Sequence, residues 1–363
     1  MEQRVSWRTG ELREGLAVAS ELMLMGDVNL MGVDDPAVPF ARVADTLAGA
    51  ALRFANLECC LYRPPGAHSV AAEGFFADPA AAGAALRLGR IDAVGLANNV
   101  NYGAAAILGS IAELDALGIA HAGAGPNLAA ARAPAILERQ GVRFGFLQRS
   151  SVYWPTGHEA AADMAGIAVI RGHTAYQVPL HKTRPEIPPM NRPGVPPTIL
   201  TWADPQYLAA FAEDVAALRP RVDFLVASCH WGLDRTVLQY MREIAHAAIE
   251  AGADIVVGHG PHYALPVEIH RGRPIFYGLG SFSFHTGHGG RRHGDWLGMM
   301  ACVRVGGGKA QASFRFVRHN ERNETILRSP AEEAAAFDEI ARDSRGLGAA
   351  LEIEGGEARL SPA

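Results

Sequence analysis

The residues of this 363-residue sequence that stand out chemically are carboxylates, amides and histidines that follow short apolar segments. Together these side chains are the usual ligands of divalent transition metals, more than of magnesium. Asp27 and Asn29 stand two residues apart in GDVNLMG, a spacing that lets both side chains leave a strand in the same direction. The other candidate ligands are Glu58, Asn99, His230, His259 and His262. A carboxylate such as Glu58 can bridge two ions, and two ions about 3.5–4 Å apart lower the pKa of a bridging water.

The apolar segments before these residues have the length and composition of buried strands. They cover residues 21–28, 51–58, 91–99, 222–232 and 253–262, and helical patterns lie at 104–118 and 237–252. This alternation predicts a layered α/β fold with a buried sheet, and ligands of such sheets bind beyond the carboxyl ends of the strands. We therefore expect the candidate ligands to converge at one edge and hold one or two divalent ions, with Mn, Zn, Fe and Ca as candidates.

Composition and charge exclude several classes of partner. The net charge is −5, with no block of basic residues, which disfavours nucleic-acid binding. No segment reaches the roughly 20 apolar residues that cross a bilayer, and the N-terminal residues are charged rather than signal-like. We expect a cytoplasmic protein, possible homo-oligomer formation, and a small-molecule or peptide substrate.

Residues 151–205 break the alternation of strands and helices. They are rich in proline and aromatic residues and have weak secondary-structure signals, which is typical of a functional loop, a lid or an interface arm. Their aromatic and basic side chains suit either a substrate pocket or an oligomer interface, and these are Tyr153, Trp154, Arg171, His173 and Tyr176. Hairpins and a helix near 330–342 follow. We expect one domain over residues 20–345, with an insertion at about 151–205 and a C-terminal tail at 346–363.

The order of the motifs resembles the CapA (poly-γ-glutamate synthesis) family. The resemblance covers about residues 20–345 and rests on GDVNLMG, ANLE, GLANNVNYG, HAGAG, HWG and GHGPHYALPVEIHRGRPIFYGLGSFSF. It implies the calcineurin-like metallophosphatase fold, a four-layer α/β/β/α sandwich. It also implies a metal site at Asp27, Glu58, Asn99, His230, His259 and His262.

The sequence departs from the family pattern at several positions. The family usually reads NNH where this chain has Val100, so a histidine that protonates a leaving group is missing, which disfavours phosphoester hydrolysis. The turn that follows is shortened, and Ser281 replaces the asparagine of the late SLGNF motif. The membrane anchor common in capsule-type members is not found in the sequence. His285, His288 and His293 follow a late strand and can supply the missing acid or base, with His285 the best placed.

Three functions remain open at this point. The first is a metal-dependent hydrolase in which a metal-activated water attacks an amide, peptidic or polyglutamyl-type bond, with His230, His285 and Asn99 as catalytic residues. The second is a metal-assisted peptide epimerase that exchanges the α-proton of a C-terminal residue, an activity found in the CapA-like family. The third is a non-catalytic factor of capsule or polymer assembly.

Overall fold

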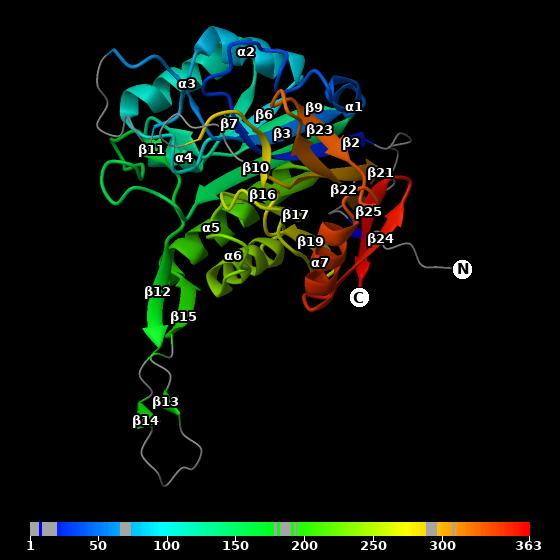
Figure 1. Cartoon of the computed structure of the whole chain (residues 1–363). Coiled ribbons are helices and arrows are strands. Elements are labelled where there is room, and N and C mark those ends of the chain that lie inside the picture. Colours follow the sequence, from blue (N-terminus) through cyan, green and yellow to red (C-terminus); the bar gives the residue numbers. More distant parts are fainter. Residues whose placement is uncertain are drawn as a thin grey trace.

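The computed structural model describes residues 7–8, 20–65, 74–177, 180–181, 190–191, 194, 196–287, 296–306 and 309–363. Two β-sheets pack face to face and carry helices on their outer faces (Figure 1). The first sheet has the order β24 (Ala349–Glu354), β25 (Glu357–Pro362), β22 (Lys309–His319), β21 (Gly298–Gly306), β2 (Ser20–Asn29), β3 (Leu52–Leu57), β6 (Ala93–Gly95) and β7 (Ala120–Ala122). The second has the order β18 (Val267–His270), β19 (Arg273–Phe276), β17 (Ile255–His259), β16 (Phe224–His230), β10 (Val142–Ser150) and β9 (Ala135–Arg139).

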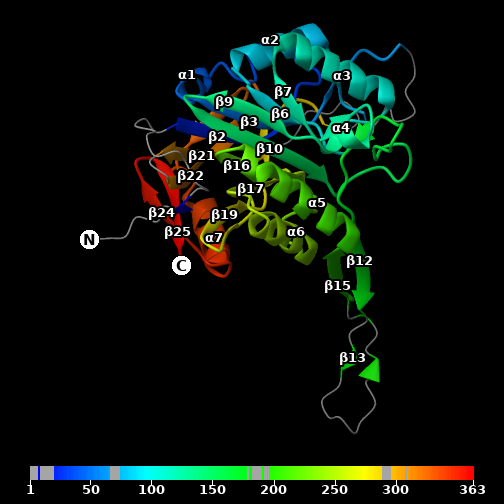
Figure 2. The same ribbon diagram turned by 180° about the vertical axis from the view of Figure 1, so that it is seen from behind.

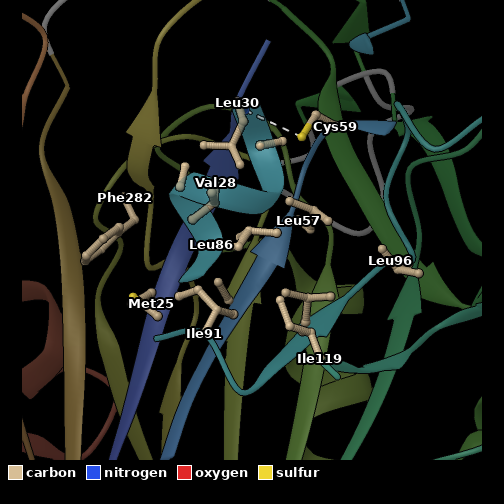
Figure 3. Close-up of a cluster of buried hydrophobic side chains, with 14 of the residues drawn as sticks. Met25, Val28, Leu30, Leu57, Cys59, Leu86, Ile91, Leu96, Ile119 and Phe282 are labelled. Carbon is tan, nitrogen blue, oxygen red and sulfur yellow. Dashed lines mark hydrogen bonds between the residues drawn. The ribbon is translucent and has the colours of Figure 1, made fainter. Parts of the chain in front are cut away.

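Three layers of apolar side chains hold these four layers together. Between the sheets, Phe54 of β3 stacks on Phe146 of β10, with ring centroids 4.8 Å apart. Figure 3 shows part of the layer on the outer face of the first sheet, where Met25 and Leu57 lie near Leu86. The helices of this layer are α1 (Ala44–Ala48), α2 (Pro79–Leu88) and α3 (Ala104–Leu117). On the outer face of the second sheet lie α5 (Pro205–Leu218) and α6 (Gln239–Glu250). The predicted four-layer α/β/β/α sandwich is confirmed.

Local sequence signals explain where two of these helices begin. Asp78 precedes α2 and Asp204 precedes α5, and each carboxylate accepts hydrogen bonds from two backbone N–H groups of the first helical turn. A proline follows each aspartate, at a position whose missing N–H would have no helical partner.

A β-bulge in β2 sets the direction of Asp27. Leu24 pairs with Phe54 of β3 and Asp27 pairs with Asn56, so β2 contains one residue more than β3 between these pairs. Leu24 packs between the sheets, whereas Met25 packs under the helices. The extra residue reverses the alternation, as bulges do, so that Val28 also packs under the helices. Asp27 is thereby turned toward the second sheet.

The same strand requires a glycine immediately before Asp27. β20 (Ser281–Phe284) runs parallel beside β2, and the Asp27 N–H donates to the Gly280 carbonyl oxygen at 2.8 Å. A Cβ atom at Gly26 would lie 1.9 Å from that oxygen. Only glycine allows the two chains to approach so closely.

Residues 151–205 form two different structures. The first part, to about residue 171, folds against the body, where β11 (Gly166–Ile167) pairs with β8 (Ala124–Gly125) and Ile167 is buried. The second part contains an antiparallel pair, β12 (Gly172–Gln177) and β15 (Thr198–Ala203), that projects from the body beyond α5 and α6 in both views (Figures 1 and 2). We call this pair the arm.

The C-terminal residues lie in the first sheet, where the sequence had suggested a tail from residue 346. β24 and β25 form a hairpin, and β25 pairs with β22 through Ser313 and Arg359. Gly355 and Gly356 make the turn with φ angles of 61° and 83°. A two-residue turn with positive φ at both positions matches the twist of a hairpin. Within the described residues, no helix is long and apolar enough to cross a bilayer.

Candidate metal centre

The candidate centre lies at the polar end of the layer between the two sheets. Phe54 belongs to the apolar part of this layer, and Asn56 and Glu58 follow on the same side of the chain because side chains alternate along a strand. In the second sheet, Val226 is followed by Ser228 and His230 in the same way. The layer therefore changes from apolar to polar toward the carboxyl ends of the strands.

Asp27 lies at the centre of the polar group and is fully buried. Its Oδ1 lies 3.4 Å from Nδ1 of His259 and accepts a hydrogen bond from the Asn56 amide at 2.9 Å. Its Oδ2 lies 3.2 Å from Nδ1 of His262 and accepts the Gly260 N–H at 3.3 Å. Burial alone would raise the pKa of Asp27, but contacts with the two histidines outweigh burial and hold the pKa well below its usual range.

Glu58 joins the same group from the end of β3. Its Oε1 lies 3.6 Å from Nε2 of His230 and 3.6 Å from Nε2 of His262. The His262 ring thus contacts both carboxylates, Asp27 through Nδ1 and Glu58 through Nε2. Burial would lower the pKa of His262, but the charges of Glu58 and Asp27 raise it to about 9. Asp27, Glu58 and His262 each offer one ligand atom within 4.8 Å of the others.

Two imidazoles show that this group fits a metal ion. His230 and His259 are buried, and among the described residues no ring nitrogen of either side chain meets hydrogen-bond geometry, the contacts with Glu58 at 3.6 Å and with Asp27 at 3.4 Å included. A buried polar atom without a partner has a substantial free-energy cost. A divalent ion bound between these nitrogens and the two carboxylates would satisfy them, and imidazole with carboxylate is the donor set of zinc, manganese and iron sites.

Asn56 and Gln148 orient the carboxylates of Asp27 and Glu58 through hydrogen bonds. Neither Asn56 nor Gln148 was predicted from the sequence. The Asn56 amide nitrogen donates to Asp27 and, at 3.4 Å, to Glu58. Gln148 donates to the Asn56 side-chain oxygen at 3.0 Å and accepts the Ala97 N–H at 2.6 Å. This chain of hydrogen bonds crosses from one sheet to the other. Such partners fix the orientation of ligating carboxylates.

For three other predicted site residues, no hydrogen bond or ion pair with the two carboxylates is seen within the described part of the chain. The Asn29 amide belongs to a turn, where it accepts the Met31 N–H at 2.9 Å and donates to the Thr286 carbonyl at 2.7 Å. Asn99 is half-buried, and no hydrogen bond of its side chain occurs within the described part of the chain. His285 follows Phe284, whose ring packs edge-on against His262 at 4.7 Å. His288 and His293 lie outside the described residues.

Two loops meet beside the centre. The Trp154 indole N–H donates to the Asn99 carbonyl oxygen at 2.9 Å. His158 is fully buried, with Nδ1 accepting the Trp154 backbone N–H at 3.0 Å and Nε2 lying 2.8 Å from the Asn101 carbonyl oxygen. Because Nδ1 accepts, the proton must be on Nε2 and point at that carbonyl. Residues 98–103 and 151–160 are therefore fastened to each other, and the sequence analysis had not identified His158.

The basic residues of the predicted lid are engaged elsewhere. Arg171 pairs with Glu159 at 2.7 Å and lies over the Tyr207 ring at 4.8 Å. His173 pairs with Asp204 at 3.1 Å and packs against Trp202 of the arm. Tyr153 is partly buried against the apolar layer under the helices. Trp154 contacts a candidate ligand residue, Asn99, through the hydrogen bond described above, and Tyr176 is 69% exposed on the arm.

Comparison with known proteins identifies the family. A sequence model of the family described as bacterial capsule synthesis protein PGA_cap matches residues 16–286. The chain belongs to this family. The resemblance to the CapA family drawn from the motifs is thus confirmed, and the fold expected from it is the one observed.

Individual relatives share shorter segments with this PGA_cap chain. The PGA biosynthesis protein CapA of Bacillus subtilis is 39% identical over 99 residues, which are 27% of this chain and 24% of that protein. A probable polyglutamine synthesis accessory protein of Mycobacterium tuberculosis is 31% identical over 198 residues, 51% of this chain and 43% of that one. This chain therefore spans less than half the length of either relative. A crystal structure described as a novel phosphatase, from Mycoplasma pneumoniae, aligns over 84% of this chain and 96% of its own, with 10% identity and a TM-score of 0.49.

Proposed function

We propose that this PGA_cap protein is a metal-dependent hydrolase of an amide bond in a peptidic or polyglutamyl substrate. The observation that carries the proposal is the pair of buried imidazoles, His230 and His259, whose nitrogens have no hydrogen-bond partner among the described residues and which lie near buried carboxylates. A vestigial site in an assembly factor would gain nothing from keeping such unsatisfied groups.

The ligands we assign to the metal come from both sheets and the loops that follow them. They are Asp27, Glu58, His230, His259 and His262, with Asn99 as a neutral ligand at the rim. A divalent ion held there would lower the pKa of water and stabilise negative charge on the substrate. Asn56 and Gln148 keep the carboxylates oriented, and the buried surroundings keep bulk water away from them.

The residues beside the centre support an amide as the bond that is cleaved. Val100 stands where the family usually has a proton-donating histidine, and its side chain is buried in the apolar layer. We assign protonation of the leaving amine to His285, which is half-buried and follows the strand beside β2. The names of the relatives, which refer to PGA biosynthesis and polyglutamine synthesis, support a glutamyl polymer or peptide as the substrate.

Metal analysis combined with an activity assay tests this function. The purified protein should contain a divalent transition metal and should release new amino groups from poly-γ-glutamate or a γ-glutamyl peptide. Chelation should abolish the release, and returning the metal should restore it. Asp27→Asn keeps the size of the side chain but removes its charge, so this variant should lose metal and activity together.

Running the assay in D₂O separates hydrolysis from the alternative, epimerisation. Deuterium incorporation at an α-carbon without new amino groups would replace our assignment by an epimerase. A wild-type protein that binds no metal under any of these conditions would contradict both assignments.

A further inference from the structure

A second group of side chains of metal-ligating types lies in and beside the second sheet, away from the candidate centre. It consists of His246 on α6 and of Glu268 and His270 on β18. β19 runs parallel to β17, whereas β18 runs antiparallel to β19 and ends at His270. His270 is therefore at the edge where β17 begins, and His259 is at the edge where β17 ends. The two groups lie at opposite edges of the sheet.

The three side chains are already close together. One ligand atom of each lies within 4.8 Å of the others. Oε1 of Glu268 lies 2.7 Å from Nε2 of His246, and the rings of His246 and His270 are stacked with centroids 3.8 Å apart and planes 4° from parallel. Imidazole nitrogens and carboxylate oxygens are ligands that zinc takes in proteins.

Outer partners hold two of the three ligands. Oε2 of Glu268 accepts the Tyr277 hydroxyl at 2.6 Å and the Arg242 Nε–H at 3.4 Å, which leaves Oε1 turned toward His246. Nε2 of His270 lies 3.1 Å from a Glu250 carboxylate oxygen. A carboxylate that binds the far nitrogen of a ligating histidine is the usual outer partner in metal sites. The histidine side chains are 26% and 21% exposed, so ions from solvent can reach them.

We propose that His246, Glu268 and His270 bind a divalent transition metal ion, with zinc as the reference ion, in a site independent of the Asp27 centre. Two histidines and one glutamate are a known zinc donor set that leaves a position open to water. The ion replaces the hydrogen bond between His246 and Glu268. The stacked rings must turn about their Cβ–Cγ bonds so that both present a nitrogen to it. The ion then connects α6 to the edge of the sheet.

Zinc binding by the intact protein tests the proposal. Protein whose Asp27 centre has been filled is dialysed against micromolar free zinc, and bound zinc and the melting temperature are measured. We expect one equivalent of zinc beyond the first centre and a higher melting temperature with zinc than without it. His246→Gln and His270→Gln should each lose this equivalent. Loss of a ligand should weaken binding by more than the roughly 10–100-fold that loss of an outer partner costs.

Two further variants make the result specific. His121→Gln changes a histidine of similar exposure, 22%, that pairs with Asp115 outside this group, and it should bind zinc as the wild type does. Asp27→Asn should keep the zinc at α6 while it loses the metal of the first centre. Equal zinc content and melting behaviour in the wild type, in His246→Gln and in His270→Gln would overturn the proposal. So would extra binding that is seen only at millimolar zinc, which would mark an adventitious ion only.

Discussion

At the scale of single residues, Val100 leaves the site without a proton donor at the position where the family usually has a histidine. Its side chain is 1% exposed in the apolar layer under the helices and has no proton to donate. General acid catalysis contributes roughly 10²–10⁴-fold when the leaving group is a poor one. An alkyl alcohol needs that protonation, whereas an aryl alcohol leaves with little help.

We therefore predict that alkyl phosphomonoesters are turned over at least about 100-fold more slowly than aryl phosphomonoesters. Steady-state assays of a matched pair of substrates with the metal-loaded protein measure the ratio. Similar rates for the two substrates would show that His285 or another residue also protonates an alcohol leaving group, and would remove the argument against phosphoesters.

The site residues that could be predicted from the sequence are those at strand ends. The end of a strand is visible as the end of an apolar segment, even when the order of the strands in the sheet is not known. Asp27, Glu58, His230, His259 and His262 lie in one group for that reason. The supporting residues were harder to predict. Asn56 and Gln148 are inside strands, and their role depends on which strand face meets the other sheet. The bulge before Asp27 is likewise visible only from the pairing of β2 with β3.

At the scale of elements, the contact between the two loops beside the centre can be tested through Trp154. Trp154→Phe keeps an aromatic ring but removes the N–H that donates to the Asn99 carbonyl. A hydrogen bond of this kind contributes about 1 kcal/mol, so we expect about fivefold weaker metal binding, measured by competition with a chelator. Trp202→Phe is the matched control, because Trp202 lies on the arm and is 41% exposed. Equal loss in both variants would contradict a specific role for Trp154.

His158, which connects the same two loops, makes the free energy of unfolding depend on pH. Burial lowers its pKa to about 4, whereas the unfolded chain has a histidine pKa of about 6.5. Between these values the unfolded state takes up a proton that the folded state does not, so stability falls as the pH decreases through this window. The loss attributable to His158 should reach about 3 kcal/mol near pH 4.

His158→Gln removes this titration, and urea unfolding at several pH values measures the effect. The free energy of unfolding of the variant should fall less steeply between pH 6.5 and pH 4 than that of the wild type. Parallel curves for the two proteins would show that protonation of His158 does not limit stability. Comparing the two proteins cancels the contribution of Asp27, whose lowered pKa also makes stability depend on acid.

The element boundaries were predicted best where the hydrophobic period was regular. The helical patterns at 104–118 and 237–252 correspond to α3 (Ala104–Leu117) and α6 (Gln239–Glu250). The arm was not predicted as strands. Its apolar residues are largely exposed, including Tyr176 and Ile199 at 69% and 58%, and periodicity indicates a strand only when one face is buried.

At the scale of the whole molecule, the C-terminal hairpin completes the layer between the sheets. Leu360 of β25 is 8% exposed and belongs to this layer, whereas Ile353 of β24 is 48% exposed. Leu360→Ala should lower the free energy of unfolding by about 2 kcal/mol, at the low end for buried leucines because the residue is near an edge. Ile353→Ala should change it by less than about 0.5 kcal/mol. Denaturant unfolding measures both, and equal effects would mean that the hairpin does not pack as described.

The position of β2 determines when the candidate metal centre can form during synthesis. One side of this strand pairs with β3, which follows soon after, but the other side pairs with β20 and β21, and His262 is 235 residues beyond Asp27. At 5–20 residues per second, a ribosome needs roughly 10–50 s to make that segment. For most of this time Asp27 and Glu58 are present without His230, His259 and His262. When the N-terminal half emerges from the ribosome, one edge of β2 is therefore unpaired. This exposed edge is a target for chaperones until β20 and β21 have been made.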